Sequence, residues 1–400
     1  MKTVDEKLTD LRRSFHRDPE VGFSEVRTKA KVAQQLRAFG VEMHEGIGVV
    51  GVLRSGGGNR TIGLRVDMDA LPIWKSSFHD YISKNDGVMH ACGHDGHMTM
   101  LLGAAEILAN EPDFDSKVVI IFQPNEEHGL GARAMIDGGL LDRFPLDEVY
   151  AIHSLPGAPL GELFTRVGQI CTSESLFDIE IRGQGGHASM PHVGVEAITV
   201  RAEIVQALQT IVSRKLAPRC GAVVSATEFL TNGQRNVLPE TARLNGDVRT
   251  RLAQDRQDVE CFMRQIVDGI AAAHGVGATV AFNTGSIETI DAPGPTEAVI
   301  QASRNAGLDT IPDRPPMSCS EDFAHFCAAV PECFLLLGNG TERPYIQPLY
   351  ASDCDFNDAL LPIGAVFLAQ LVRDRLPKKG PHDAVTAPQS AYRTHRSEPR

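Results

Sequence analysis

The sequence predicts an α/β protein in which a mixed-sheet domain with helices on both faces carries an inserted α+β domain of the ferredoxin-like type. Three observations support this prediction. The chain has 400 residues, more than one domain usually holds. Apolar strand patterns alternate with helical patterns over its first part, which is typical of α/β folds. Between 174 and 285 the order becomes β-α-β-β-α-β, the ferredoxin-like arrangement.

The mixed-sheet domain begins with an amphipathic helix, because Val4, Leu8, Leu11 and Phe15 recur at helical spacing. A second helix over 25–39 ends before a glycine. Further helices are expected at 95–109 and 131–138, and buried strands at 48–53, 61–66, 117–122 and 148–152. Strands that alternate with helices in this way predict a mostly parallel sheet.

The inserted domain begins where the hydrophobic pattern changes. Phe177, Ile179 and Ile181 alternate with polar residues, as in a half-exposed strand. The expected elements that follow are a helix at 194–215, strands at 222–229 and 240–249, a helix at 254–273 and a strand at 277–283. A sheet with both helices on one face leaves an edge strand free, which favours contact with a second copy. Residues 174–285 are therefore predicted to form a lid and dimerisation domain.

The α/β pattern resumes after the insertion. Helices are expected near 295–306, 321–329 and 358–375, and an apolar strand at 333–337. The first domain is thus predicted to be discontinuous, made of 1–173 and 286–377. The tail, 378–400, is rich in Pro, Lys, Arg, His and Ser and is predicted to be disordered.

The composition argues against nucleic acids and membranes as partners. Lys plus Arg number 39 and Asp plus Glu 51, which gives a net charge of −12 without a basic run to neutralise phosphates. No apolar stretch approaches the roughly 18 residues of a membrane-spanning helix, and the N-terminus lacks the apolar core of a secretory signal. Eight scattered cysteines without a C-x-x-C pair favour a reducing, cytoplasmic setting.

The densest group of reactive side chains is HACGHDGH at 90–97, which places Cys92 and His94 where a loop meets an apolar helix. His, Cys and Asp are good ligands for zinc-like ions, and ligands from the loop and the helix can converge. The alternative is a polar helix cap whose histidines are already hydrogen-bonded. The density of ligands favours a metal site.

A second group, QPNEEHG, follows the strand 117–122 and contains Glu126 and Glu127. Sites in open α/β sheets form at the carboxyl ends of strands. One carboxylate of such a pair can bind a metal while the other takes a proton from water. An acidic surface loop is the alternative. His153, which follows the strand 148–152, is a further candidate ligand.

Two more motifs carry candidate residues in supporting positions. Asp67 and Asp69 of RVDMDALP follow a buried strand, where one acid can orient a metal-binding His or can simply cap a turn. His187 lies in the Gly-rich loop GQGGHASMPH, which can bring it to a substrate or can be only a turn. Asn236 of NVLPE and Arg249 of DVRT can hold a substrate carboxylate, or can be surface residues.

Taken in order, these motifs and a later SEDF resemble the amidohydrolase branch of the dinuclear-metal aminoacylase and carboxypeptidase family. Members include hippurate hydrolase, N-acyl-amino-acid amidohydrolase and indole-acetyl-amino-acid hydrolase. The resemblance covers nearly the whole chain apart from its tail. It implies a metal-dependent hydrolase that cleaves the amide bond of small N-acyl amino acids and assembles as a homodimer or higher oligomer.

The resemblance also implies a role for each matching residue. Glu126 matches the general base. His187 matches a lid histidine that reaches the substrate carbonyl, in relatives from the partner subunit, and Asn236 and Arg249 match positions near the substrate. Four residues match ligands of two divalent ions, zinc or manganese: Cys92, His94, Glu127 and His153.

One position departs seriously from the family pattern. Relatives carry a last ligand His in a segment like L-H-x-x-x-x-D-F-N-D, and here PLYASDCDFND at 348–358 places Tyr350 there. A phenol is a poor ligand for zinc or manganese unless it loses its proton, and its reference pKa is about 10. Asp353 or Cys354 can take over as ligand only if the loop shifts. The second metal site, and to a lesser degree the activity, therefore depend on how this loop folds.

Two other functions stay open at this point. The first is a different C–N hydrolase on the same scaffold, an N-carbamoyl amidohydrolase or a dipeptidase. The second is a metal-poor relative that binds an acyl-amino acid without cleaving it, an alternative that rests on Tyr350.

Overall fold

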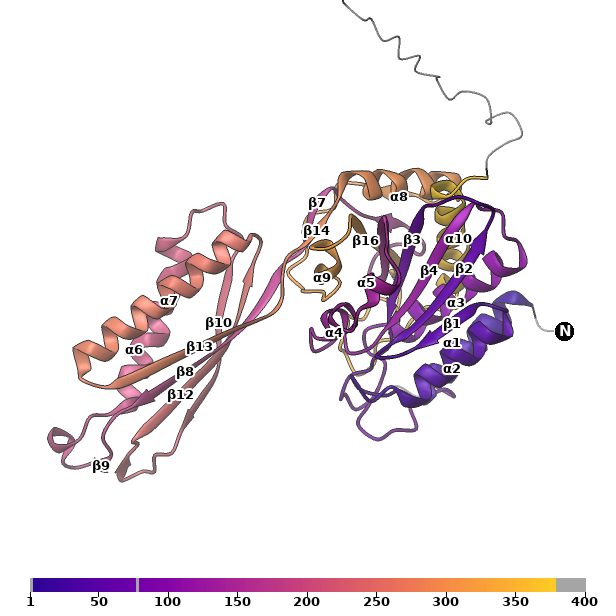
Figure 1. Cartoon of the computed structure of the whole chain (residues 1–400). Coiled ribbons are helices and arrows are strands. Elements are labelled where there is room, and N and C mark those ends of the chain that lie inside the picture. Colours follow the sequence, from indigo (N-terminus) through magenta and orange to yellow (C-terminus); the bar gives the residue numbers. More distant parts are fainter. Residues whose placement is uncertain (1–2, 77–78, 379–400) are drawn as a thin grey trace, which may run out of the picture.

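The computed structural model describes residues 3–76 and 79–378, and these form a large unit and a smaller, elongated unit joined by extended strands (Figure 1). The large unit contains both the beginning and the end of the described chain. The smaller unit consists of a segment from the middle of the chain. The expected disorder of the tail lies outside the described residues, except for Lys378.

The large unit is built on an eight-stranded mixed sheet in the order β1-β2-β4-β3-β5-β16-β6-β15. Its central strands β4, β3, β5 and β16 are parallel, whereas β1, β2 and β6 add antiparallel pairs. The strands are β1 (Glu42–Glu45), β2 (Val49–Ser55), β3 (Thr61–Asp67), β4 (Ser116–Gln123), β5 (Glu148–Pro156), β6 (Leu163–Phe164), β15 (Thr310–Ile311) and β16 (Glu332–Gly340). The expected mixed sheet is thus confirmed, and its central strands are parallel.

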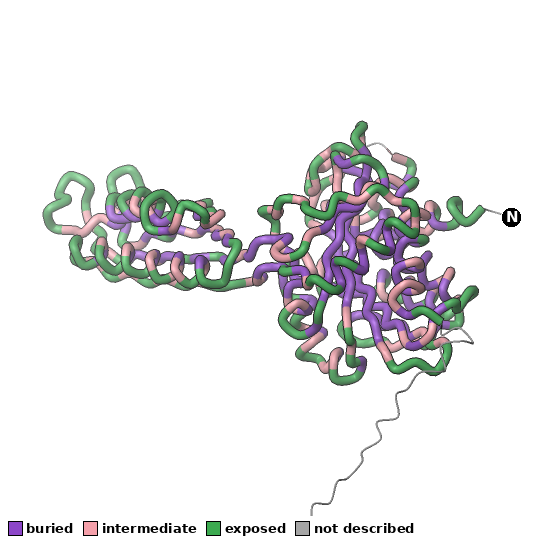
Figure 2. The backbone as a smooth tube through the Cα atoms, turned by 90° about the horizontal axis from the view of Figure 1, so that it is seen from above, coloured by how far each residue is buried: buried purple, intermediate pink, exposed green. Residues whose placement is uncertain are grey.

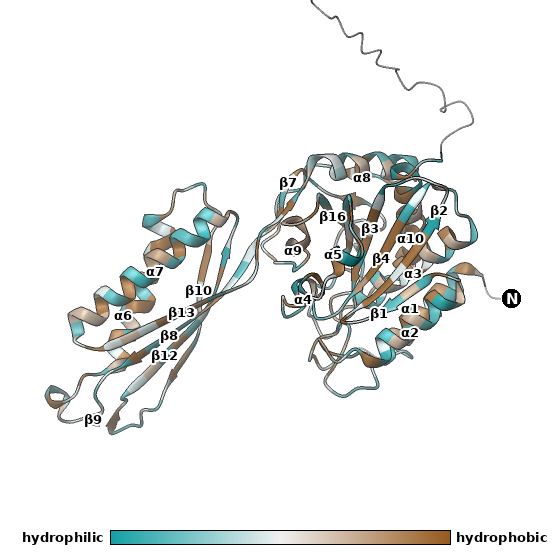
Figure 3. Ribbon diagram, viewed as in Figure 1, coloured by the Kyte–Doolittle hydropathy of each residue, from teal (hydrophilic) through white to brown (hydrophobic). Residues whose placement is uncertain are grey.

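Helices cover both faces of this sheet, as the alternation along β4 requires. Val118 and Ile120 face one hydrophobic cluster, and Val119 and Ile121 face the other. The first cluster packs under α1 (Val4–Arg17), α2 (Val26–Ala38), α3 (His94–Asn110), α8 (Pro293–Asn305) and α10 (Leu360–Arg375). The second packs under α4 (Gly131–Asp137), α5 (Leu140–Arg143) and α9 (Ala324–Cys327). The buried strands form the centre of the unit in Figure 2, and Figure 3 shows that the same strands are its most apolar part.

The smaller unit is a four-stranded antiparallel sheet, β10-β12-β8-β13, with two helices on one face (Figure 1). Its elements are β8 (Ser173–Arg182), α6 (Ala197–Thr210), the π-helical turn η2 (Ile211–Lys215), β10 (Val223–Thr231), β12 (Thr241–Thr250), α7 (Ala253–His274) and β13 (Gly277–Ser286). This is the strand order of the ferredoxin-like unit, and Phe177, Ile179 and Ile181 point into its core. Among the described residues, no helix covers the other sheet face, and the edge strand β10 pairs only with β12.

Short pairs of strands complete the chain. β9 (Gly186–His187) pairs with β11 (Val237–Leu238) at the tip of the smaller unit, next to the 3₁₀ turn η1 (Pro191–Val193). β7 (Gly168–Cys171) pairs with β14 (Thr289–Asp291) where the two units meet. The helix expected at 321–329 is shorter, since α9 covers only four residues and turns flank it. Within the described ranges, no helix has the length and apolar composition needed to cross a membrane.

Candidate metal centre and active site

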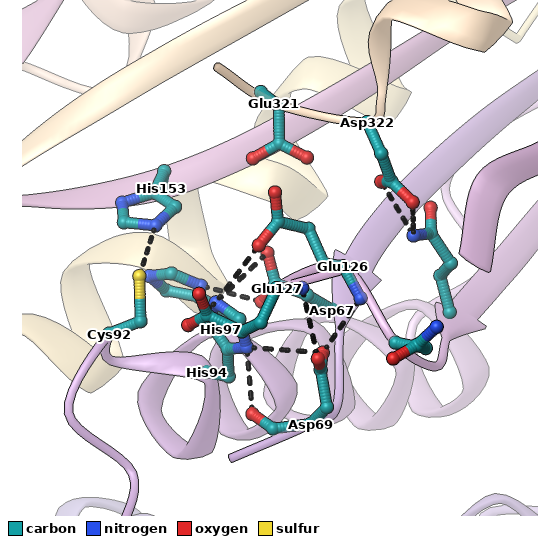
Figure 4. Close-up of polar contacts among 12 residues, drawn as sticks. Asp67, Asp69, Cys92, His94, His97, Glu126, Glu127, His153, Glu321 and Asp322 are labelled. Atoms are coloured by element: carbon teal, nitrogen blue, oxygen red, sulfur yellow. Dashed lines mark hydrogen bonds and ion pairs between the residues drawn. The ribbon is translucent and has the colours of Figure 1, made fainter. Parts of the chain in front are cut away.

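The motifs that the sequence separates meet at the carboxyl ends of β3, β4 and β5 (Figure 4). Asp67 ends β3, Glu126 and Glu127 follow β4, and His153 lies in the second half of β5. Because these three strands are neighbours and parallel, their ends lie at one edge of the sheet. The amino end of α3 brings His94 to the same place.

Two buried atoms in this group have no hydrogen-bond partner. Nε2 of His94 and Oε1 of Glu127 lie 3.8 Å apart, and their side chains are 0% and 2% exposed. Nδ1 of His94 donates to the main-chain oxygen of Asp69 at 2.8 Å, which leaves Nε2 as the ring atom that can bind a cation in place of a proton. A buried polar atom without a partner costs free energy, so both atoms indicate a ligand between them.

Cys92 and His153 lie on the other side of His94. Sγ of Cys92 is 3.3 Å from Nε2 of His153, and Nδ1 of His153 donates to the Ser154 oxygen at 2.8 Å. The Nε2 lone pair of His153 therefore points toward Cys92, as it would toward a metal. Cys92, His94 and Glu127 each offer one ligand atom within 4.8 Å of the others. The structure thus brings the four predicted ligands together.

The loop before α3 requires glycine at position 93. Gly93 precedes the helix with a φ of +89°, in the left-handed region that other residues rarely adopt. A Cβ atom there would lie 2.5 Å from Oγ of Ser154. The glycine therefore lets Cys92 and His94 converge on one side of a tight turn.

Asp69 holds the Glu126–Glu127 pair in place. Its two carboxylate oxygens accept the main-chain N–H groups of Glu126 and Glu127, each at 3.0 Å. Because the Asp69 oxygen also orients His94, one residue positions both a candidate base and two candidate ligands.

Asp67 orients a different histidine. Its Oδ1 accepts Nδ1–H of His97 at 2.8 Å, and Nε2 of His97 accepts the main-chain N–H of Ser154 at 2.9 Å. Both ring nitrogens of His97 are therefore engaged, so this member of HACGHDGH supports the site rather than offering a lone pair. Oδ2 of Asp67 lies 3.7 Å from Nε2 of His94.

Three acidic or basic residues of the site were given no role by the sequence. Glu321 and Asp322 of SEDF lie beside Glu126, and Nη2 of the fully buried Arg65 contacts them at 3.1 and 2.9 Å. Nη1 of Arg65 also contacts Asp67 at 3.3 Å. Arg65 and the SEDF segment belong to motifs that the sequence made recognisable. A motif does not predict, however, that Arg65 contacts Asp322, which lies 257 positions away.

The pKa values of the buried carboxyl and imidazole side chains in this site indicate a place for a cation. Burial and the carboxylates of Glu321 and Glu127 raise the pKa of Glu126 well above its usual range. Burial raises the pKa of Glu127 to about 7. Burial by itself would lower the pKa of His94, but Asp67 and the other carboxylates around it raise that pKa to about 10. Glu126 and Glu127 retain protons because the positive charge around them does not balance the negative charge of the carboxylates. A divalent cation would balance it.

The donor set fits such an ion. Thiolate, imidazole and carboxylate ligands bind zinc at distances of roughly 2.0–2.3 Å, so one cation can touch both His94 and Glu127 across their 3.8 Å separation. Tyr350 approaches from outside: Oη donates to Oε2 of Glu127 at 2.6 Å. Burial and the Cys92 thiol raise the pKa of Tyr350, so its phenol keeps the proton that it donates.

The candidate substrate-binding residues separate into two groups. Arg249 of β12 lines a cavity of about 520 Å³ between the two units, together with Glu126, Glu127 and Tyr350. This interdomain cavity has the size of a small-molecule site. The Arg249 guanidinium donates to Ser320 at 3.0 Å and is also held by Asp247 and Glu174.

His187 and Asn236 lie elsewhere. His187 belongs to β9 at the tip of the smaller unit, and Figure 1 shows this tip far from the large unit. The main-chain oxygen of Asn236 accepts the N–H of Ala188 at 3.0 Å, so the two predicted residues are near each other. Within the described chain they are not brought to the metal ligands, and their roles stay a prediction.

Comparisons with known proteins show which family the chain resembles. Residues 63–374 match the model of peptidase family M20/M25/M40. Thermostable carboxypeptidase 2 of Saccharolobus solfataricus is 33% identical, with 93% of this chain and 96% of that protein covered. Hippurate hydrolase of Campylobacter jejuni is 35% identical, with 90% and 94% covered. A solved Bacillus subtilis structure, described as a dinuclear metal binding peptidase from the M20 family, aligns with a TM-score of 0.81 at 27% identity over 93% and 98% of the chains.

These matches confirm the family resemblance, the α/β class and the expectation of an amidohydrolase that uses a divalent metal and acts on small molecules. The matched region spans the candidate metal ligands, the Glu126–Glu127 pair and the smaller unit. The chain belongs to peptidase family M20/M25/M40.

Proposed function

We propose that the protein hydrolyses the amide bond of N-acyl amino acids, releasing a carboxylic acid and a free amino acid. The observation that carries this proposal is Glu126 beside the unpartnered atoms of His94 and Glu127. A carboxylate with a raised pKa next to a cation site is suited to take a proton from water and return it. The names of the hippurate hydrolase and carboxypeptidase relatives support an amide as the bond that is cleaved.

In this mechanism the divalent ion, zinc or manganese, would be held by Cys92, His94, Glu127 and His153. When bound, the ion acts as a Lewis acid on the substrate carbonyl. Glu126 accepts the proton of the attacking water and then delivers it to the leaving amine. Asp69 keeps the Glu126 main chain fixed throughout, through the 3.0 Å hydrogen bond that it accepts.

The interdomain cavity supplies the substrate site. Arg249 is the cation that faces this cavity with Glu126 and Glu127, and we assign it to the substrate carboxylate. Its guanidinium is already flanked by Asp247 and Glu174, which keep it oriented and together carry two negative charges against its single positive charge. Substitution of Arg249 by Met should therefore raise KM more than it lowers kcat.

Tyr350 limits the centre to one tightly held ion. It replaces the family's last ligand His, and its protonated phenol occupies one oxygen of Glu127. A second ion, as in the dinuclear relatives, would therefore lack one ligand here, and Tyr350 would already be bonded to an oxygen of another, Glu127. Neither expected substitute fills the gap: Oδ2 of Asp353 accepts from Gln347, and Sγ of Cys354 donates to the Ala91 oxygen at 3.4 Å.

A homodimer accounts for the position of His187. The edge strand β10 exposes Phe229 and Leu230, 47% and 53% accessible, and pairs only with β12 among the described strands. An open apolar edge of this kind is a ready contact for a second copy. Such a contact would bring the tip that carries His187 to the partner's cavity. A light-scattering mass equal to that of one chain would contradict the homodimer.

A substrate panel tests the proposed reaction. The zinc- or manganese-loaded protein is incubated with N-acyl amino acids, N-carbamoyl amino acids and dipeptides, and the released amine is measured. Preferential cleavage of the acyl compounds supports the proposal. Ammonia release identifies a carbamoylase, and preference for dipeptides identifies a peptidase. Binding without turnover by the loaded protein would identify the non-catalytic alternative that Tyr350 suggested.

A further inference from the structure

Two cysteines outside the proposed ligand set lie side by side near the active site. Sγ of Cys171 and Sγ of Cys319 are 4.0 Å apart, although 148 residues separate them in the sequence. Cys171 ends β7 and is fully buried, whereas Cys319 is exposed in the loop before α9. This pairs an accessible thiol with a buried one.

The main chain fixes this approach. Thr172, next to Cys171, donates its N–H to the oxygen of Cys319 at 2.9 Å, and its hydroxyl donates to the oxygen of Ser318 at 2.8 Å. Met317 N–H donates to the oxygen of Ile170 at 2.8 Å. Because hydrogen bonds hold both chain segments on either side of the sulfurs, the approach of the two backbones does not depend on a choice of side-chain rotamer.

Both sulfurs line the same cavity as the candidate catalytic residues. This inner cavity is bounded by Cys92, Glu126 and His153 as well as by Cys171 and Cys319. Cys319 also lines the interdomain cavity on the substrate side. In the described part of the chain, neither cysteine belongs to a group that could hold a metal ion.

We propose that Cys171 and Cys319 form a redox-active dithiol, which closes to a disulfide and reshapes the substrate cavity. An accessible cysteine beside a second, resolving cysteine is the arrangement that makes thiol oxidation reversible. The sulfurs need to approach by only about 2 Å to reach the bonded distance of about 2.05 Å. Rotation of the exposed Cys319 side chain, with a smaller shift of the loop that carries it, can make this movement.

The oxidant is a low-molecular-weight disulfide, for which glutathione disulfide serves as the probe. The Cys319 thiolate attacks one sulfur, forms a mixed disulfide and releases one glutathione thiolate. The Cys171 thiolate then attacks the Cys319 sulfur and releases the second. The two protein thiols lose two protons and two electrons in total, and glutathione disulfide gains them as two thiols.

The disulfide would act on the site through the loop that it moves. Ser320 follows Cys319 directly and accepts a hydrogen bond from Arg249 at 3.0 Å, and Glu321 lies beside Glu126. A misplacement of about 1 Å in a catalytic site can lower the rate about a hundredfold. We therefore expect oxidation to lower kcat/KM by roughly ten- to a hundredfold. This second part rests on the proposed hydrolase function.

The first experiment detects the disulfide directly and needs no measurement of activity. The zinc-loaded full-length protein is equilibrated with glutathione disulfide, denatured, and its free thiols are alkylated and counted by mass spectrometry. We expect two thiols fewer than the eight cysteines, and a non-reduced peptide that joins Cys171 to Cys319. Glutathione that stays on Cys319, or a disulfide between other cysteines, would overturn the proposal.

The second experiment compares, for each variant, the kcat/KM of the oxidised protein with that of the same protein in its reduced state. Cys319→Ser changes an exposed side chain and should abolish the loss of kcat/KM on oxidation. Cys261→Ser is the matched control, because Cys261 is also exposed but lies on α7 of the smaller unit. It should remain as sensitive as the unaltered protein. Equal sensitivity of Cys319→Ser would contradict regulation through this pair. A protein without hydrolase activity would still form the disulfide, so the two proposals fail separately.

Discussion

The phenol of Tyr350 donates a 2.6 Å hydrogen bond to Oε2 of Glu127, across 223 residues of sequence. The main chain of Tyr350 is in the left-handed region, with a φ of +68°, and its N–H donates to the oxygen of Ala91 at 2.9 Å. For a bulky residue this conformation is strained. The loop thus keeps an unfavourable backbone that presents the phenol to a candidate metal ligand.

Restoring the family histidine should change the metal content. Tyr350→His supplies an imidazole lone pair and frees Oε2 of Glu127, so we expect two ions per chain in place of one. Elemental mass spectrometry after loading with zinc or manganese measures this number. Tyr350→Phe is the control, because it frees the oxygen without adding a ligand, and it should stay near one ion. Two tightly held ions in the unaltered protein would refute our account of Tyr350.

Removal of the carboxylate of Glu126 should separate catalysis from metal binding. Glu126→Gln keeps the shape of the side chain but cannot accept a proton, and general-base catalysis contributes roughly 10²–10⁴-fold. We expect kcat to fall by about that factor while the metal content stays the same. Glu127→Gln is the matched comparison, since it should lower the metal content as well. Unchanged turnover in Glu126→Gln would reject the assignment of the base.

Mixing two inactive variants should reveal whether His187 works in the partner's site. Chains with Glu126→Gln keep His187, and chains with His187→Ala keep Glu126. In a mixed dimer, one site then contains both intact residues, so activity should return after the two variants are denatured and refolded together. A His187 that serves its own chain leaves every site of the mixture defective. Failure of the mixture to regain activity would therefore exclude the exchange.

The carboxylate of Glu332 should make the protein less stable at higher pH. Glu332 is 1% exposed at the start of β16, beside the buried Asp291, and burial raises its pKa to about 7. Because the pKa of Glu332 is raised in the folded state, the folded protein keeps this carboxyl protonated at pH values where the unfolded chain has lost the proton. The resulting stabilisation is complete below the unfolded pKa of about 4.5 and is lost as the pH rises through about 7.

Glu332→Gln removes this ionisation. We expect urea unfolding to show a gain of roughly 1–3 kcal/mol for the variant at pH 8 and a smaller one at pH 5, since one pKa unit corresponds to about 1.4 kcal/mol. Asp291 is buried nearby and shares the proton, so its own pKa is also raised by burial and by Glu332. An equal effect of the substitution at both pH values would contradict this reading.

Local patterns predicted the elements that are fully buried or strictly alternating. The run at 117–122 became β4, and the alternation at Phe177 became β8, because burial on both faces or on one face dictates those patterns. The short strands β6, β7, β14 and β15 were not predicted. Two to four residues carry too little periodicity, and their pairing depends on partners far along the chain.

The sequence by itself determined the chemistry available to the protein: a dense ligand motif, the Glu126–Glu127 pair, and a tyrosine where relatives have a histidine. Only the tertiary structure decided which of these residues meet. It placed Arg249 in the cavity and His187 at a distant tip, and it brought Cys171 within 4.0 Å of Cys319. The reason is physical: strand order and loop packing set such contacts, and they depend on the burial of the whole chain rather than on any local pattern.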